Sequence, residues 1–433
     1  MREIGIGLIG FGTVGSGVAQ ILDEQGLTIE RRTGMRPRLI CAARRHWPAT
    51  APAHAPAERL TDVLAVVRDP RVQLVIEVMG GTDLALTAIE EALRLGKPVV
   101  TANKAVLSVH GNRIFALSES TATPIRFEAS VAGAIPVIRG LLESLAGDHV
   151  DRIGGILNGT CNYILTEMWR RRVDFGLVLA EAQAKGYAEA DPSADVDGWD
   201  TAHKVSVLAR LAFETAVDVQ SLGVRGIRDI TLQDMEAAHE LGCTIRLLGM
   251  LERQGDKLAV RVEPNLVELE HPLAAVLGAH NGVQTRSAYA GDLLWMGRGA
   301  GQLPTANSVV SDVLSLLGWP EHRIHGPSLG YSVATQKPLS VTPVLTRPYY
   351  LRVMVPNKPG TLAEITGLCA KAGINISSLL QHERHHQSEP WASVVLTTSP
   401  VANTEIETLC RSLGPLAHPH EPVRAYPMLL TPR

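Results

Sequence analysis

The chain has 433 residues, 45% hydrophobic and 20% charged, a composition typical of globular domains with sizeable cores. A net charge of −3 and an aromatic content of 4% argue against a nucleic-acid surface or an anionic membrane partner. Neither a signal-peptide layout nor a membrane-spanning apolar run is present, and five scattered cysteines without CxxC spacing favour a reducing, cytoplasmic location.

The first element is a short apolar run, residues 4–9, that predicts a buried strand leading into a glycine-rich turn and a helix. A GxGxxG pattern in this context predicts dinucleotide binding, because Gly10 allows the tight turn and Gly12 lets the backbone approach a pyrophosphate. The residues of the turn are Gly10, Phe11, Gly12, Thr13, Val14 and Gly15.

A second strand is predicted at 38–43 and is followed by Arg44 and Arg45. Sites that prefer NAD usually carry an acid here, which binds the ribose hydroxyls. A guanidinium instead suits the 2′-phosphate of NADP. The pattern therefore favours NADP, with NAD as the alternative cofactor and two solvated arginines as the non-functional interpretation.

Strands at 74–79 and 97–101 alternate with a helix at 84–95, which predicts a doubly wound parallel sheet. Ligands of such sheets bind beyond the carboxyl ends of the strands, so Lys104 is expected near the nicotinamide. A structural lysine at a strand end is the alternative. After a strand at 125–130, the dinucleotide domain (1–135) should end.

Residues 136–325 mix helices and strands and predict an α+β substrate domain. A second glycine-rich loop is predicted at 297–301, before a helix at 304–317. We expect this helix to return to the first domain, which would bring Gly301 towards the cofactor; a plain turn is the alternative.

The stretch 186–204 holds five acids and ends in a helix start with Asp200 and Lys204 four residues apart. That spacing places both side chains on one side of the helix. An acid and an amine presented together could bind an ammonium group and move a proton. A solvated acidic loop is the competing interpretation.

Pro338, Pro343 and Pro348 mark a linker at 326–348, and residues 349–433 follow a strand, helix, strand, strand, helix order. This order predicts a small ferredoxin-like module. The segment from His382 to Glu389 has three histidines without metal-ligand spacing, so a solvated hairpin loop is favoured over a metal site there.

Taken together, these motifs resemble those of homoserine dehydrogenases over essentially the whole chain. The matching segments, in the family's order, are 10–15, 101–104, 127–133, 158–160 and 182–204. The resemblance implies a Rossmann-type domain, a substrate and dimerisation domain, and a regulatory ACT domain at 349–433. It also implies NAD(P)H-dependent reduction of L-aspartate 4-semialdehyde to L-homoserine, in threonine, methionine and isoleucine biosynthesis.

Site roles also follow from the resemblance. Lys204 is the expected proton donor, Asp200 and Glu189 bind substrate, and Lys104 lies at the cofactor–substrate junction and assists catalysis. Gly186 and Gly301 should line the cofactor. A structural sodium ion, held largely by backbone carbonyls, would map to Glu128, Val131, Gly133 and Ile135.

Regulation and assembly are implied by the resemblance as well. Threonine is the expected inhibitor, although the position before Lys358, often Asp in ACT domains, is Asn357 here. A homodimer or homotetramer is expected, and the length leaves no room for a fused aspartate kinase. Two alternatives stay open: a related oxidoreductase of another small amino acid or aldehyde, with Cys161 the candidate nucleophile of an acylating enzyme, and a non-catalytic amino-acid sensor.

Overall fold

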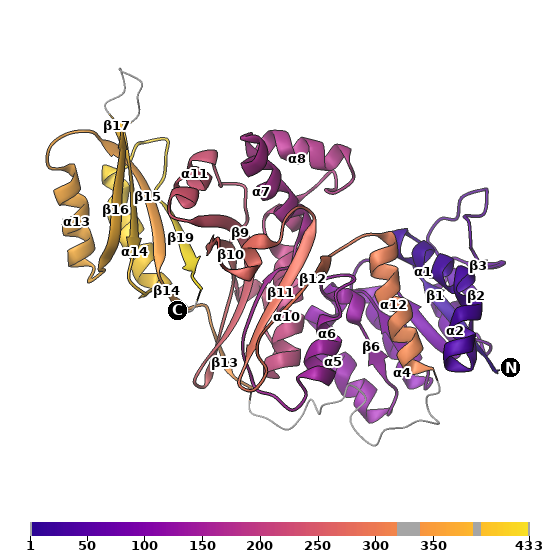
Figure 1. Ribbon diagram of the computed structural model, residues 1–433. Coiled ribbons are helices and arrows are strands. Elements are labelled where there is room, and N and C mark those ends of the chain that lie inside the picture. Colours follow the sequence, from indigo (N-terminus) through magenta and orange to yellow (C-terminus); the bar gives the residue numbers. More distant parts are fainter. Residues whose placement is uncertain (1, 318–337, 384–390, 432–433) are drawn as a thin grey trace. The chain divides into compact units, whose positions relative to one another are not determined.

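The computed structural model describes residues 2–317, 338–383 and 391–431 (Figure 1). The chain divides into two compact units. The first comprises Met1–Gly159, Asp200–Ser221 and Ala279–Ser340, and the second comprises Thr160–Trp199, Leu222–Gly278 and Val341–Arg433. Residues 318–337, which include much of the expected linker, and residues 384–390 of the histidine segment lie outside the described residues.

A parallel six-stranded sheet organises the N-terminal part of the first unit, in the order β3-β2-β1-β4-β5-β6. Its strands are β1 (Arg2–Ile9), β2 (Met35–Ala43), β3 (Glu58–Leu60), β4 (Leu74–Glu77), β5 (Val99–Thr101) and β6 (Ile125–Arg126). The intervening helices are α1 (Thr13–Glu24), α2 (Gly26–Thr33), α3 (Val63–Arg68), α4 (Asp83–Arg94) and α5 (Lys104–Ser120). The strand order reverses between β1 and β4, the place where doubly wound sheets bind dinucleotides.

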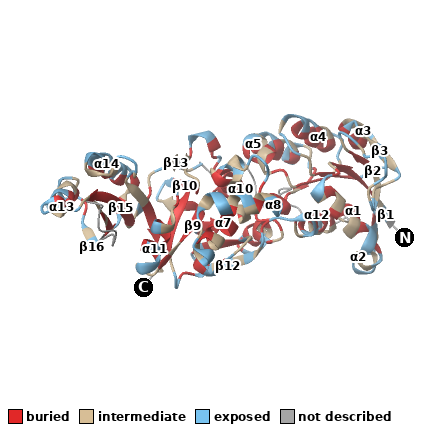
Figure 2. Cartoon of the chain, turned by 90° about the horizontal axis from the view of Figure 1, so that it is seen from above, coloured by how far each residue is buried: buried red, intermediate tan, exposed pale blue. Residues whose placement is uncertain are grey.

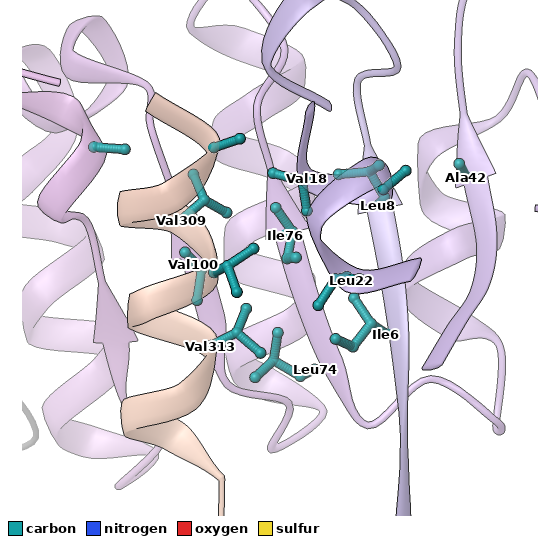
Figure 3. Packing of buried hydrophobic residues seen from close by; sticks show 14 of the residues in the cluster. Ile6, Leu8, Val18, Leu22, Ala42, Leu74, Ile76, Val100, Val309 and Val313 are labelled. Atoms are coloured by element: carbon teal, nitrogen blue, oxygen red, sulfur yellow. The ribbon is translucent and has the colours of Figure 1, made fainter. Parts of the chain in front are cut away.

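Helix α12 (Gln302–Leu316) packs on this sheet beside α1, as expected from the sequence. In Figure 3, Val309 and Val313 of α12 lie close to Val18 and Leu22 of α1 and to Ile76 of β4, all members of one buried cluster. The contact is close, since a Cβ on Gly17 would stand 2.9 Å from the Gln302 carbonyl oxygen. Helix α12 therefore shares the core of the dinucleotide sheet.

The first unit also contains an antiparallel group of strands and the helix that carries Lys204. Strand β11 pairs with both β7 and β12. The bounds are β7 (Val150–Ile156), β11 (His280–Ser287), β12 (Gly291–Arg298), α6 (Val137–Arg139), the π-helical η2 (Gly140–Ser144), the 3₁₀ turns η1 (Glu128–Ser130) and η3 (Val219–Ser221), and α10 (Trp199–Phe213). Strand β13 (Ser340–Thr342) begins at the last residue of this unit and lies mostly in the second. Treating Gly297 and Arg298 as loop was wrong, because both complete β12.

The second unit combines helices with the long antiparallel pair β9 (Cys243–Gln254) and β10 (Lys257–Glu268). Its other elements in this part are α7 (Gly159–Arg171), α8 (Phe175–Ala184), α9 (Ser193–Val196), β8 (Gly223–Val224), α11 (Leu232–Glu240) and the 3₁₀ turn η4 (Pro272–Ala275). The sequence pattern did not predict β9, because this strand is buried along most of its length and shows little alternation.

The C-terminal module confirms the ferredoxin-like prediction, with sheet order β19-β15-β17-β16 and antiparallel pairing throughout. Its elements are β14 (Thr346–Arg347), β15 (Tyr349–Pro356), α13 (Thr361–Lys371), β16 (Ile376–Glu383), β17 (Trp391–Thr398), β18 (Val401–Ala402), α14 (Asn403–Leu413), the 3₁₀ turn η5 (Gly414–Leu416) and β19 (Arg424–Leu429). Apolar residues of α13 and α14 share one core with the sheet.

Buried residues follow the strands and the inner helix faces, while exposed residues lie along the outer faces of helices (Figure 2). Helix α10 is the exception, since most of its residues are buried, the polar Asp200, Thr201 and Lys204 among them. Among the described residues, no helix is long and apolar enough to cross a membrane.

Candidate active site

The start of helix α10 carries the acid and the amine singled out by the sequence. Asp200 lies in its first turn, and Lys204 follows one turn later. The Lys204 Nζ atom lies 2.7 Å from Asp200 Oδ2, so the predicted i,i+4 pair is formed. The side chains of Lys204 and Asp200 are only 11% and 10% exposed. The pair therefore sits in the interior, and the solvated-loop interpretation is wrong for these two residues.

Lys104 joins the same carboxylate from another element. It is the first residue of α5, after the helix cap Asn103, and its Nζ lies 2.9 Å from Asp200 Oδ1. Each carboxylate oxygen thus faces one ammonium group. Burial alone would raise the pKa of Asp200, but Lys204 and Lys104 outweigh it and hold that pKa far below its usual range. Asp200 is therefore ionised at neutral pH.

Two buried asparagines, neither predicted from the sequence to have a role, complete this cluster. Asn158 donates from Nδ2 to Asp200 Oδ2 at 2.9 Å. The Leu157 carbonyl accepts from Lys204 Nζ at 2.7 Å and from Asn281 Nδ2 at 2.9 Å. Asn158 stood in a segment shared with the family, whereas Asn281 lies on a strand and carried no motif.

One donor of Lys204 stays unused. Two of its three N–H groups bond to Asp200 and to the Leu157 carbonyl, and the third has no partner among the described residues. A substrate oxygen can accept that hydrogen bond. A charged, oriented ammonium group is what a developing oxyanion needs.

The glycine-rich turn fits a pyrophosphate. Gly10 adopts φ +99°, and a Cβ there would stand 2.8 Å from the backbone of Val78 and Met79. Gly12 caps α1 without any side-chain hydrogen bond, and a Cβ on it would meet nothing within 4 Å. The open helix N-terminus, at Thr13 and Val14, therefore offers backbone N–H groups to an anion.

Other predicted cofactor residues lie around this sheet. Phe11 is buried and packs against Trp47, with ring centroids 5.2 Å apart, so its side chain supports the turn. Gly301 caps α12 at φ +130°, and the next residue, Gln302, donates to Ser16 of α1 at 3.0 Å. Gly301 therefore lies beside α1, the helix that the glycine-rich turn opens.

The four residues mapped to a sodium site lie together after β6. The Glu128 carboxylate is buried and already accepts from the backbone N–H groups of Ile138 (2.8 Å) and Arg139 (2.9 Å). Burial raises its pKa to about 7. The Gly133 carbonyl accepts from Ser308 at 2.8 Å. Any cation here would thus rely on the remaining lone pairs of carbonyl oxygens, and the described residues gather no cluster of three acidic, histidine or cysteine side chains for a metal.

Glu189 and Gly186 belong to the second unit, and both are exposed. The Glu189 carbonyl accepts from Gln183 Nε2 at 3.0 Å, and Gly186 follows α8 at φ +73°. Their binding roles stay predictions. The neighbouring Asp191 shapes the loop, because its Oδ1 accepts from the backbone of Ser193.

Cys161 does not have the environment of a nucleophile. It is fully buried, and its Sγ donates to the Asp195 carbonyl at 3.1 Å. A thiol in that role is not presented to a substrate, and reactive cysteines are partly exposed.

The module at the C-terminus has a small cavity of about 140 Å³ at the turn between β15 and α13. Asn357 lines it, and its Oδ1 accepts from Gln381 Nε2 at 3.3 Å. Lys358, Gly360 and Thr361 contribute further to its wall.

A doubly wound sheet with a pyrophosphate turn, and a charged lysine held by an ionised carboxylate, define a nicotinamide-dependent oxidoreductase. The Homoserine dehydrogenase family matches residues 136–314, its NAD binding domain matches 10–128, and the ACT domain matches 349–410. The chain is 37% identical to a homoserine dehydrogenase of Neisseria gonorrhoeae and 36% identical to one of Pseudomonas aeruginosa, over 98% of each chain.

Among solved structures, a homoserine dehydrogenase from Thiobacillus denitrificans superposes with a TM-score of 0.92 at 34% identity, over 99% of both chains. The chain belongs to the homoserine dehydrogenase family. It is an NAD(P)-dependent oxidoreductase that reduces L-aspartate 4-semialdehyde to L-homoserine, and it carries an ACT domain.

Proposed function

We propose that Lys204 protonates the aldehyde oxygen while the nicotinamide supplies the hydride. This role rests on the hydrogen bonding of the Lys204 ammonium group. Asp200 and the Leu157 carbonyl accept from two of its N–H groups, and the third has no partner among the described residues. Hydride addition builds negative charge on oxygen, and a fixed N–H donor stabilises that charge. Lys104 adds a second positive charge at the same carboxylate and assists.

Substrate recognition uses acids. The substrate carries an α-ammonium group, and we assign its binding to Asp200 and Glu189. Asp200 remains ionised through its two lysines, so it can attract a third cation without taking up a proton. Glu189 is exposed and therefore accessible to a ligand.

We further infer a preference for NADP. Arg44 and Arg45 directly follow β2, where the ribose is bound in folds of this type, and the described residues show no ion pair to either side chain. Gly186 and Gly301 are assigned to the cofactor side. A structural sodium ion at Glu128, Val131, Gly133 and Ile135 is part of the proposal; the left-handed Ala132 and Gly133 turn that backbone sharply.

Regulation is assigned to the ACT domain. Threonine is the proposed inhibitor, and the small cavity beside Asn357 has a size suited to an amino acid. Assembly as a homodimer or homotetramer and a cytoplasmic location complete the proposal.

One assay tests these assignments together. Homoserine oxidation is followed at saturating NADP⁺ or NAD⁺, with and without threonine. We expect turnover with both cofactors, a lower KM for NADP⁺, and inhibition by threonine that Asn357→Ala weakens. Equal KM values would remove the role of the arginines, and threonine-insensitive turnover would remove the role of the cavity. The absence of turnover with either cofactor would contradict the mechanism itself.

A further inference from the structure

A buried carboxyl group, Glu77, lies at the end of β4 and has no part in the mechanism above. Its side chain is completely buried. Its Oε2 accepts from the Thr101 hydroxyl at 2.5 Å, and its Oε1 accepts from the backbone N–H of Met79 at 2.9 Å. Thr101 ends β5, so this carboxyl links two neighbouring strand ends at the ligand-binding edge of the sheet.

The hydrogen bonds continue from Thr101 to the start of α5. The Thr101 Oγ1 atom accepts from the backbone N–H of Asn103 at 3.0 Å. The Asn103 side chain caps α5 through the N–H of Val106 at 3.2 Å, and its Nδ2 donates to the carbonyls of Met79 (3.2 Å) and Gly81 (2.8 Å). Lys104, which holds Asp200, is the next residue.

The direction of these bonds requires an acceptor at both oxygens of Glu77. Met79 and Thr101 each present a hydrogen to it. Because the Thr101 hydrogen is committed to the carboxyl, a lone pair of Oγ1 faces the N–H of Asn103. A glutamine would turn an amide N–H towards one of the two donors and break this order.

Burial at this position disfavours the ionised form of Glu77. Burial raises the pKa of Glu77 to about 7, against the lowering by hydrogen bonds from Thr101, Met79 and Asn103. The folded state therefore binds more protons than the unfolded state between the two pKa values, and stability falls as pH rises through that range.

We propose that Glu77 is a positioning residue for Lys104: it fixes Asn103 through Thr101, and so sets where the Lys104 ammonium meets Asp200. The proposal rests on the assigned role of Lys104. It predicts that changing Glu77 affects catalysis through Lys104 and not through a general loss of structure.

A double-mutant cycle of Glu77→Gln and Lys104→Ala tests this coupling. We expect Glu77→Gln to lower kcat about 10-fold or more in the parent enzyme, since misplacing a catalytic group by a fraction of an ångström is costly, with the KM for NADP⁺ little changed. In the Lys104→Ala background the same change should lower kcat less than about 2-fold. Thr101→Val, which keeps the carboxyl but removes its link, should reproduce the loss.

Two controls separate the alternatives. Glu90→Gln alters another buried acid, one that pairs with Arg94 and Arg113 on helix surfaces, and should change kcat less than about 2-fold. The Tm of Glu77→Gln relative to the parent should rise between pH 5.5 and 8.5, which shows that the variant folds and that Glu77 titrates in the folded state.

Equal losses from Glu77→Gln in both backgrounds would overturn the proposal, as would a Thr101→Val enzyme with parental kcat. If Lys104→Ala alone leaves kcat unchanged, the assigned role of Lys104 fails, and any loss from Glu77→Gln then also refutes positioning through Lys104. If Lys104→Ala is impaired and Glu77→Gln is not, only the inference about Glu77 is wrong.

Discussion

Two buried aspartates in this protein pair with cationic side chains, and the two sites differ in how many N–H donors of those cations have hydrogen-bond partners. Asp200 meets Lys204 and Lys104 in the first unit. Asp234 in the second unit is fully buried, lies 2.7 Å from Arg352 Nε, and also accepts from the hydroxyl of Thr231 at 2.8 Å. The first carboxylate belongs to a site and the second to a seam between α11 and β15.

The remaining donors make the difference. Arg352 also bonds to Gln233, Glu421 and Thr231, so each of its nitrogens has a partner. Arg352 is 5% exposed, whereas Lys104 is 39% exposed and one N–H group of Lys204 has no partner among the described residues. A buried cation whose donors all have partners stabilises structure, and a cation with a donor left over can bind a ligand. The comparison makes predictions for both sides.

The largest effect is expected at Lys204. Lys204→Ala removes the proposed proton donor, and we expect kcat to fall about 10³-fold, within the usual range for general acids. Cofactor affinity, measured by fluorescence titration of NADPH, should stay within about 2-fold of the parent. Lys204→Arg retains the charge but releases no proton near neutral pH, so it should recover little. A Lys204→Ala enzyme with parental kcat would show that the unused donor has no catalytic role.

At the Arg352–Asp234 pair, where each nitrogen of the arginine side chain has a partner, a substitution should affect stability and not catalysis. Arg352→Met leaves Asp234 buried without its cation, which costs about 3 kcal/mol in the free energy of unfolding. Urea unfolding measures the loss, and kcat should remain close to that of the parent. The matched control is Arg424→Met, because Arg424 pairs at 3.6 Å with an Asp229 that is 75% exposed, and such pairs contribute under about 1 kcal/mol. Equal losses in the two variants would remove the distinction by burial.

Asp200→Asn should affect both catalysis and stability, because Asp200 holds two lysines in place and also contributes to folding. We expect kcat to fall about 10²-fold, since neither ammonium is then held by charge. The pKa of Asp200 is depressed in the folded state, so its stabilising contribution is present above the unfolded pKa near about 4 and is lost as pH falls. The Tm difference between variant and parent should therefore be largest near neutral pH and shrink in acid. A pH-independent difference would contradict the ionised, lysine-braced carboxylate.

The sequence predicted those parts of the site that depend on local spacing. Asp200 and Lys204 are one helical turn apart, and the glycine turn is contiguous, so periodicity and turn chemistry were sufficient. Lys104 was placed at a strand edge, but its contact with Asp200 joins distant parts of the chain and has no local signal. The same holds for Asn281, which reaches the Leu157 carbonyl over 124 residues, and for the pairing of Arg352 with Asp234.

The sequence missed strand β9 and the end of β12 for a related reason. Strand β9 is almost continuously buried and shows no alternation, so the period-2 pattern was missing. In β12 the alternation is clear, but Gly297 near its end suggested a loop. A Cβ on Gly297 would stand 3.2 Å from the Ile135 side chain. The glycine therefore fits a close tertiary contact, which a local sequence pattern cannot reveal.

The smallest expected effect concerns Arg44, a cation with no ion pair among the described residues. Arg44→Ala removes a guanidinium proposed to meet the 2′-phosphate, so the KM for NADPH should rise about 10-fold, the equivalent of one charge-assisted hydrogen bond, while the KM for NADH changes less than about 2-fold. Arg36→Ala is the control, because Arg36 is an exposed arginine earlier on β2 that already faces Glu30 at 4.0 Å. If both cofactors lose affinity equally, Arg44 supports the turn instead of the phosphate. If neither KM changes, an unused donor on a partly exposed cation is not by itself evidence of a ligand, and deeper burial of the cation becomes a necessary second condition.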